Sequence, residues 1–314
     1  MEIILVIMFV ALSIFANGFL TTNNLLGILR NMAIVGVVAF GMTMVIIGGE
    51  IDLSVGSGIG LSSVMTALVA SKAVVAGMDP NTAVILGIVT ALLIGTLMGF
   101  ITGYIRARFN IPSFIITLAT LNIMYGLAAT VSKGFPIIIS SSWFSVIGAG
   151  QIFGSGSFRG IPVPAIWLLA VFLIIHIIMN HTQFGREVYA VGGNPEAARL
   201  SGINVNRVKI FIMTVVQTLA AFAGVIMSSQ VLAGSSQFGR GYEMDVVSAV
   251  IIGGASLSGG MGNTWGTFIG IVFLGVLMNG MTLLGIGDFT KYIVRGTLIL
   301  IAVLLNITQQ QRSK

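Results

Sequence analysis

The residues best suited to chemistry lie in one short polar interruption, from Glu50 to Gly58. It places the carboxylates of Glu50 and Asp52 beside the hydroxyl of Ser54, between two apolar segments that leave little room for a loop. A carboxylate at membrane depth is costly and usually functional, for instance in binding a solute or an ion. Non-helical backbone persists at that depth only where protein or a water-filled cavity satisfies it. Two interpretations stay open: a broken helix beside a transport path, or a cytoplasmic turn in which Asp52 or Ser54 caps the next helix.

A second polar interruption, residues 253–263, is rich in glycine and serine and carries no carboxylate. We expect Gly253, Gly254 and Ser256 to form a tight re-entrant or hinge segment, because glycine permits backbone conformations that other residues avoid. Both interruptions follow the same five residues, since Val-Ile-Ile-Gly-Gly occurs at 45–49 and again at 250–254. An apolar segment comes next each time. The pattern favours an internal duplication over chance, as is common among transporters, and leaves open whether the halves are parallel or inverted.

Two amides, those of Asn122 and Gln217, lie midway along otherwise apolar segments. Interhelical hydrogen bonds are the usual reason for such amides, and lining of a polar path is the alternative. Other chemistry is sparse: the chain has no cysteine, no G-x-x-x-x-G-K-[ST] phosphate loop and no metal-ligand spacing of histidine and glutamate. We therefore predict that the chain is not an enzyme, with no catalytic residue, metal site or cofactor, and that any ATP hydrolysis takes place on a separate subunit.

One short helix stands out among the polar segments. Asn194 followed by Pro195 is an N-cap and first-turn signal, and Glu196 suits the positive end of the helix dipole. Arg199 lies near the expected end, where Gly202 supplies a stop. A helix of about two turns is marginal alone in water. It should therefore dock on this chain or on a partner.

These elements lie in a chain of 314 residues, of which 56% are hydrophobic and 8% charged. A soluble domain carries about 25% charged residues. The composition thus predicts an all-α polytopic membrane protein in a lipid bilayer. The net charge of +6 comes from basic residues scattered singly, which indicates an orientation signal and excludes a nucleic-acid partner.

We expect about ten transmembrane helices with broken or re-entrant segments, although the eighth is so short that nine is the alternative. The whole of 1–314 would form one permease domain with approximate halves 32–180 and 208–306, joined by a cytoplasmic loop, 181–209. Ten spans with both ends in the cytoplasm agree best with the positive-inside rule, under which lysine and arginine are enriched in cytoplasmic loops. The expected segments are 3–20, 32–48, 53–71, 83–105, 113–132, 164–180, 208–228, 243–256, 264–283 and 290–306.

Three motifs in the same order resemble a known family: Ile51 to Ser57, Gly192 to Val205, and Ile252 to Gly266. They are similar to the permease subunits of bacterial ATP-binding-cassette (ABC) importers of the ribose, xylose and galactose type, the binding-protein-dependent inner-membrane components. The resemblance covers nearly the whole chain from Ala16 onward. One departure is Glu50, which stands where relatives usually have a small residue, most often glycine.

The resemblance implies a multi-pass protein of the bacterial inner membrane that forms the path for a monosaccharide. It implies a separate ABC ATPase, a second permease copy or a related permease, and a periplasmic or lipoprotein sugar-binding protein. The short helix would be the coupling helix that docks on the ATPase, and Glu196-Ala197-Ala198 with Gly202 matches the docking-loop signature. The residues carried over are Asn194, Pro195, Glu196, Ala197, Ala198, Arg199 and Gly202.

Alternative functions stay open at this point. Permeases of nucleoside, autoinducer and branched-chain amino acid importers are related, but the form of the docking loop favours the sugar branch. An ion-driven secondary transporter also fits the repeat and the broken helices, with Glu50 and Asp52 as the strongest candidate ion ligands. A scaffold protein would leave the polar interruptions unexplained. The sequence does not name the solute.

Overall fold

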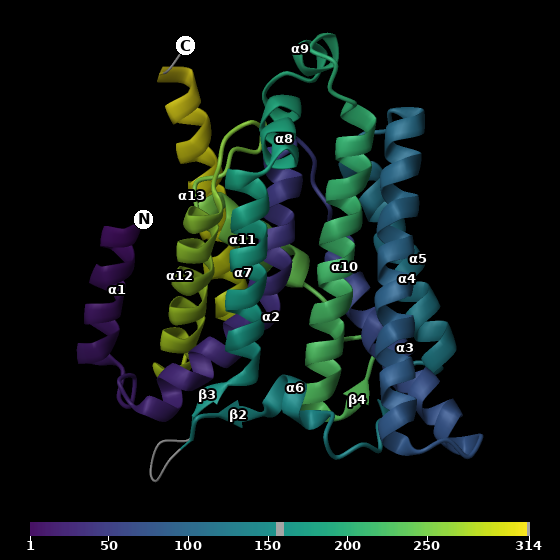
Figure 1. Ribbon diagram of the computed structural model, residues 1–314. Coiled ribbons are helices and arrows are strands. Elements are labelled where there is room, and N and C mark those ends of the chain that lie inside the picture. Colours follow the sequence, from purple (N-terminus) through teal and green to yellow (C-terminus); the bar gives the residue numbers. More distant parts are fainter. Residues whose placement is uncertain (155–159, 313–314) are drawn as a thin grey trace.

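Long apolar helices form the body of the protein in the computed structural model, which describes residues 1–154 and 160–312 (Figure 1). Seven helices of the described part are long and apolar enough to cross a membrane: α2 (Thr22–Ile47), α3 (Val55–Val75), α4 (Pro80–Phe109), α5 (Ser113–Ser132), α7 (Val163–His181), α10 (Val205–Val231) and α12 (Thr264–Leu283). The expected all-α, multi-pass architecture is therefore confirmed. The other three expected segments coincide with α1 (Glu2–Phe15), α11 (Tyr242–Ile252) and α13 (Asp288–Arg312).

Local sequence signals fix where the long helices begin. The carboxylate of Asp79 accepts hydrogen bonds from the backbone of the first turn of α4, whose first residue is Pro80. Thr21, Asn204 and Asn263 cap α2, α10 and α12 in the same way, each with its own side-chain oxygen. Such caps satisfy backbone N–H groups that have no partner within the helix.

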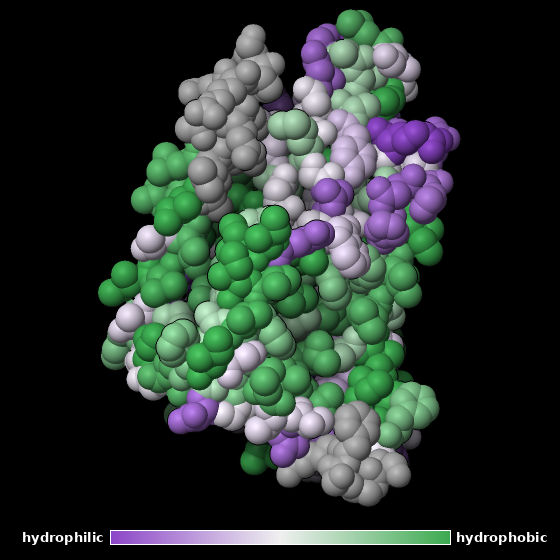
Figure 2. Space-filling view, turned by 90° about the vertical axis from the view of Figure 1, so that its left-hand side faces the viewer, coloured by the Kyte–Doolittle hydropathy of each residue, from purple (hydrophilic) through white to green (hydrophobic). Residues whose placement is uncertain are grey.

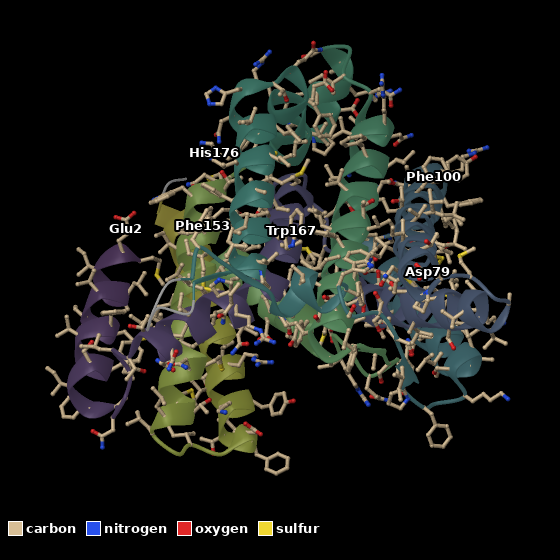
Figure 3. All side chains as sticks on the ribbon, turned by 60° about the horizontal axis from the view of Figure 1, so that its bottom comes forward. Glu2, Asp79, Phe100, Phe153, Trp167 and His176 are labelled. Carbon is tan, nitrogen blue, oxygen red and sulfur yellow. The ribbon has the colours of Figure 1, made fainter. Side chains whose placement is uncertain are left out.

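The core centres on α2, which is buried at every residue from Gly36 to its end and packs against α7, α10, α11 and α12. On the other side of α10, α4 approaches closely along a stripe of small residues. A Cβ atom added at Gly95 would lie 2.4 Å from the Cβ of Ala221, and one at Gly99 would lie 2.8 Å from the carbonyl oxygen of Met213. Seen from the lower end, Trp167 lies inside the bundle and Phe100 on its periphery (Figure 3).

Short strands and one helix close the lower end in Figure 1. β1 (Ile137–Ile138) pairs antiparallel with β4 (Ala233–Gly234), and β2 (Gln151–Ile152) pairs antiparallel with β3 (Ile161–Pro162). α6 (Ser145–Ala149) lies under the end of α10, where the backbone N–H of Gly148 donates to Ser229 Oγ at 2.8 Å. Beyond β4 the chain turns back into the bundle as residues 235–241, which we call the re-entrant segment, and then begins α11.

The surface agrees with insertion in a bilayer. Figure 2 shows hydrophobic side chains gathered over the middle of one face, with hydrophilic ones concentrated towards its upper and lower ends. The upper end carries α8 (Gln183–Gly193) and α9 (Pro195–Leu200), together with the end of α4 (Figure 1).

Candidate functional site

The first polar interruption breaks the path of the chain between α2 and α3. α2 ends at Ile47, and Gly49 adopts a left-handed conformation with φ +76°, so that the N–H of Glu50 donates to the carbonyl of Val45 at 3.0 Å. Residues 48–54, here called the α2–α3 break, then cross to the start of α3. Gln217, which contacts the break, is the thirteenth of the 27 residues of α10. Asp52 and Ser54, the residues of the break that Gln217 contacts, therefore lie beside the middle of a membrane-spanning helix.

Asp52, Ser54 and Gln217 meet in this break, and all three are fully buried. Asp52 accepts hydrogen bonds from the backbone N–H and the hydroxyl of Ser54, at 2.8 and 2.5 Å, and from Gln217 Nε2 at 2.9 Å. Gln217 Nε2 also donates to Ser54 Oγ at 2.7 Å. Gln217 thus makes the interhelical hydrogen bonds that its sequence position indicated. Asp52 therefore bonds the N-cap residue of α3, Ser54, and not an N–H group of the first turn, and Ser54 makes no side-chain cap hydrogen bond. A place beside a transport path stays a prediction.

Glu50 lies in a separate buried ion cluster, with a side chain only 1% exposed. Arg106 of α4 binds its carboxylate through two nitrogens, Nη2 to Oε1 at 2.6 Å and Nε to Oε2 at 2.9 Å. Lys209 of α10 places Nζ 2.6 Å from the same Oε1 atom. The cluster therefore ties the α2–α3 break to two other helices. In the sequence, Arg106 and Lys209 counted only among the basic residues that indicate membrane orientation. The unusual carboxylate at position 50 is the signal that could have predicted a buried ion pair with them.

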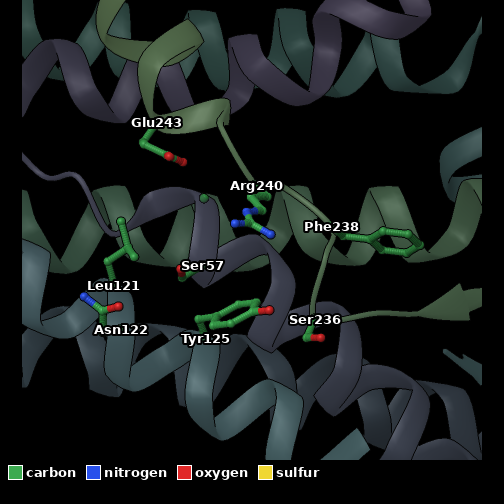
Figure 4. A pocket seen from close by; sticks show the side chains of 9 residues that line it. Ser57, Leu121, Asn122, Tyr125, Ser236, Phe238, Arg240 and Glu243 are labelled. Atoms are coloured by element: carbon green, nitrogen blue, oxygen red, sulfur yellow. The ribbon is translucent and has the colours of Figure 1, made fainter. Parts of the chain in front are cut away.

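Asn122 lies apart from both buried clusters. It borders a cavity of about 210 Å³ between α3, α5, the re-entrant segment and α11 (Figure 4). Its amide donates to the carbonyl of Leu118 one turn earlier, at 2.9 Å, so the hydrogen bond recorded for it stays within its own helix. Other polar side chains around this cavity come from Ser57, Tyr125, Ser236, Arg240 and Glu243.

The second interruption repeats the geometry of the first. α11 ends at Ile252, Gly254 has φ +94°, and the N–H of Ala255 donates to the carbonyl of Val250 at 3.2 Å, which matches the end of α2 residue for residue. Ser256 then closes a tight loop by donating its N–H to the carbonyl of Met261 at 2.9 Å. Gly253 packs against the start of α12, since an added Cβ would lie 2.4 Å from the carbonyl oxygen of Gly266. A hinge role for Gly253, Gly254 and Ser256 stays a prediction.

The short helix α9 projects from the upper end of the protein (Figure 1). The side chain of Asn194 caps it as expected, accepting from the N–H groups of Glu196 and Ala197 at 3.1 and 3.0 Å. Ala198 is buried beneath the helix, whereas Leu200 is 78% exposed. Gly202, with φ +87°, ends the turn that follows.

An exposed ion pair lies on the outer surface of α9. Arg199 Nη2 is 2.6 Å from Glu196 Oε1, and both side chains are about two-thirds exposed. The hydrogen bond from Arg199 and its positive charge hold the pKa of the Glu196 carboxyl below its usual value. The pair therefore presents a charged surface next to an exposed leucine, at neutral pH.

α8 connects α9 to both polar interruptions. A Cβ atom added at Gly192 would lie 1.7 Å from the carbonyl oxygen of Ile47 and 2.7 Å from the N–H of Gly260, so only glycine fits at this crossing. Gly260 in turn donates to the carbonyl of Ile47 at 2.8 Å, and Tyr189 Oη donates to the carbonyl of Gly262 at 3.0 Å. The helix that carries α9 thus packs directly on the end of α2 and on the loop after α11.

Comparison with known proteins identifies the family. Residues 24–303 match the family described as "Branched-chain amino acid transport system / permease component". The chain belongs to this permease family. It is a multi-pass protein of the inner membrane, as the seven membrane-length helices and the family together show.

Curated relatives match the permease along almost its whole length. The Ribose import permease protein RbsC of Bacillus subtilis is 44% identical over 96% of this chain and 90% of its own. The protein of the same name from Escherichia coli K12 is 36% identical, over 98% and 93% of the two chains. The L-arabinose transport system permease protein AraH of Escherichia coli K12 is also 36% identical, over 100% and 92%. No solved structure matches the permease significantly.

Proposed function

We propose that the permease forms the membrane path of an ABC importer for a monosaccharide such as ribose. The near full-length similarity to permeases named for ribose and L-arabinose import carries this proposal. The geometry supports it, because the chain presents a rigidly capped, exposed helix at one end of a bundle of membrane-length helices. Related importers of nucleosides or autoinducer-type sugars are the nearest alternatives.

An ion-driven mechanism receives less support. Glu50 and Asp52 are the two carboxylates that it would use, and both are buried and held by side chains of the protein. A free ion ligand would require one of these contacts to break. Energy would instead come from ATP on a separate subunit, and this permease would not be an enzyme.

The partners follow from the two ends of the bundle. We propose that residues 194–202 dock on an ABC ATPase at the cytoplasmic side, and that a sugar-binding protein delivers its ligand to the end closed by β1–β4. Arg106, Arg108 and Arg186 lie at the end that carries α9, as the positive-inside rule requires of a cytoplasmic face. A second permease copy or a related permease would complete the path.

The finer architecture is also part of the proposal. α1, α11 and α13 would bring the number of spans to ten, with α11 preceded by a re-entrant segment. The two Val-Ile-Ile-Gly-Gly copies end α2 and α11 with the same hydrogen bonds. Asn24 at the start of α2 bonds Asn279 near the end of α12, and the end of α2 bonds the loop before α12, so α2 and α12 run in opposite directions. α11 leads into that same loop. Both α2 and α11 therefore run towards the upper end. This favours a parallel arrangement of these two copies.

Reconstitution tests the proposal. The permease, its ATPase and its binding protein in proteoliposomes should import ribose only when ATP is supplied on the ATPase side. Glu196→Arg and Gly202→Asp should leave membrane insertion intact and lower uptake at least tenfold, because each alters the exposed docking surface. Glu2→Arg makes the same charge change on α1, away from α9, and should leave uptake unchanged. Normal uptake in both docking variants, or uptake by the permease alone under a proton or sodium gradient, would contradict the proposal.

A further inference from the structure

The polar cavity beside Asn122 lies at the middle of the membrane-spanning region. Asn122 is the tenth of the 20 residues of α5, and Leu121 and Tyr125 of the same helix also border the cavity. Ser57 lies across from them, near the start of α3 (Figure 4). Arg240 is exposed here, although a charged side chain facing lipid at this depth is costly. The open side of the cavity therefore faces water or protein.

Glycines on α3 let the opposite wall come close. Glu243 Oε2 occupies the space next to Gly56, since a Cβ atom added there would lie 2.1 Å from it. A Cβ atom added at Gly60 would lie 3.0 Å from the carbonyl oxygens of both Ser236 and Phe238. These contacts hold the re-entrant segment and the start of α11 against α3, with the Glu243 carboxylate at the cavity wall.

Hydrogen bonds join the re-entrant segment to α5 on the other side. Gln237 Nε2 donates to Tyr125 Oη at 3.0 Å, and Arg240 Nη1 donates to Gln237 Oε1 at 3.4 Å. Among the residues that the structure describes, Glu243 forms no ion pair, even though Arg240 borders the same space. Arg240 and Glu243 thus bring one positive and one negative charge to the cavity wall without neutralising each other in an ion pair.

The chemistry of the wall selects a class of solute. One positive and one negative charge leave no net attraction for an anion or a cation. Hydroxyls from Ser57, Tyr125 and Ser236 and the amide of Asn122 can donate and accept, while Phe238 offers an apolar face. The space of about 210 Å³ is several times the ≈ 30 Å³ that one water occupies in the liquid. We infer that this cavity is a mid-membrane binding station for a neutral, hydroxyl-rich solute, an inference that rests on the proposed function.

The absence of cysteine in this chain makes the inference directly testable. Ser57→Cys and Asn122→Cys each place one thiol in the cavity with little change in volume. Leu93→Cys is the matched control, because Leu93 is the fourteenth of the 30 residues of α4 and its side chain is 64% exposed on the apolar surface. A membrane-impermeant methanethiosulfonate reagent is then added to the reconstituted complex during ATP turnover.

We expect the two cavity thiols to react at least tenfold faster than the thiol at position 93. Excess ribose should slow their modification, and complete modification should stop ribose uptake. Equal reaction rates at all three positions, or normal uptake after complete modification, would overturn the inference. If free leucine, added in place of ribose, slows the modification of the cavity thiols equally well, the choice of a neutral solute is overturned. Leucine is a zwitterion, which could pair with both Arg240 and Glu243. Failure of the proposed function shows separately, as a lack of ATP-dependent ribose uptake by the unmodified wild-type complex.

Discussion

Replacing Glu50 by glutamine removes the carboxylate that two buried cations share. Arg106 Nη2 and Lys209 Nζ each lie 2.6 Å from Glu50 Oε1. Their separation is therefore at most about 5 Å, where two unit charges repel by roughly 3 kcal/mol at an effective dielectric constant of about 20. Removal of one partner from a buried ion pair typically costs about 3–5 kcal/mol. We expect Glu50→Gln to lower the free energy of unfolding by about 3 kcal/mol or more.

Thermal unfolding of the full chain in lipid nanodiscs measures this change, with the fluorescence of the three tryptophans as signal. A loss of about 3 kcal/mol corresponds to a fall in Tm of roughly 6 °C or more, from the shift of about 2–4 °C per kcal/mol seen in domains of 150–250 residues. Glu196→Gln is the control, because the Glu196–Arg199 pair is mostly exposed and such pairs contribute little. Its Tm should match that of the wild type.

A second substitution tests the cause. Lys209→Met keeps most of the length of the lysine stem and removes one of the two cations. In the Glu50→Gln background it should restore at least half of the lost Tm, because the repulsion with Arg106 disappears. If Glu50→Gln leaves the Tm unchanged, or if the double variant is less stable than Glu50→Gln alone, the electrostatic reasoning is wrong.

Two further predictions concern contacts around the same break. Gly192→Ala should reduce ATP-dependent uptake at least tenfold, because the added Cβ would collide with the carbonyl of Ile47. Gly193→Ala is the control: its added Cβ would meet nothing within 4 Å, so this variant should transport normally. Gln217→Leu removes the amide nitrogen that donates to both Asp52 and Ser54. It should lower the free energy of unfolding in nanodiscs by about 1–3 kcal/mol, the usual cost of an unsatisfied buried polar group. Thr214→Val on the same helix removes a hydroxyl whose hydrogen bond goes to the carbonyl of Ile210, one turn earlier in that helix, so an equal loss there would contradict this reasoning.

Much of the fold could be predicted because its signals are local. Runs of apolar residues long enough to span a bilayer marked all seven membrane-length helices. The repeated Gly-Gly pair marked both interruptions, although the expected segment 243–256 ran four residues beyond the end of α11 at Ile252. Asn194 and Pro195 predicted the start of α9 to the residue. Each of these signals depends on a few neighbouring residues and needs no knowledge of tertiary contacts.

The pairing within the candidate site could not be predicted in the same way. Glu50 contacts Arg106 and Lys209 across 56 and 159 positions of sequence, so their meeting depends on how whole helices pack. For the same reason the path and hinge candidates separate into four places: the two buried clusters, the cavity at Asn122 and the loop at Ser256. Residue type indicated that each was unusual in a membrane, and only packing shows what each one touches.

α9 is linked to the end of α2 and to the α2–α3 break through the two helices next to it in the chain. α9 has two covalent routes inward, α8 on one side and α10 on the other. Along α8 the contact at Gly192 rests on the end of α2 without any side chain between the two backbones. Along α10, Lys209 reaches Glu50, and two turns further on Gln217 reaches Asp52. The route along α8 therefore reaches the last residue of α2, and the route along α10 reaches the break that follows it. Because a protein interior is closely packed and yields little, a displacement of α9 would act on the two ends of one short stretch, from Ile47 to Asp52.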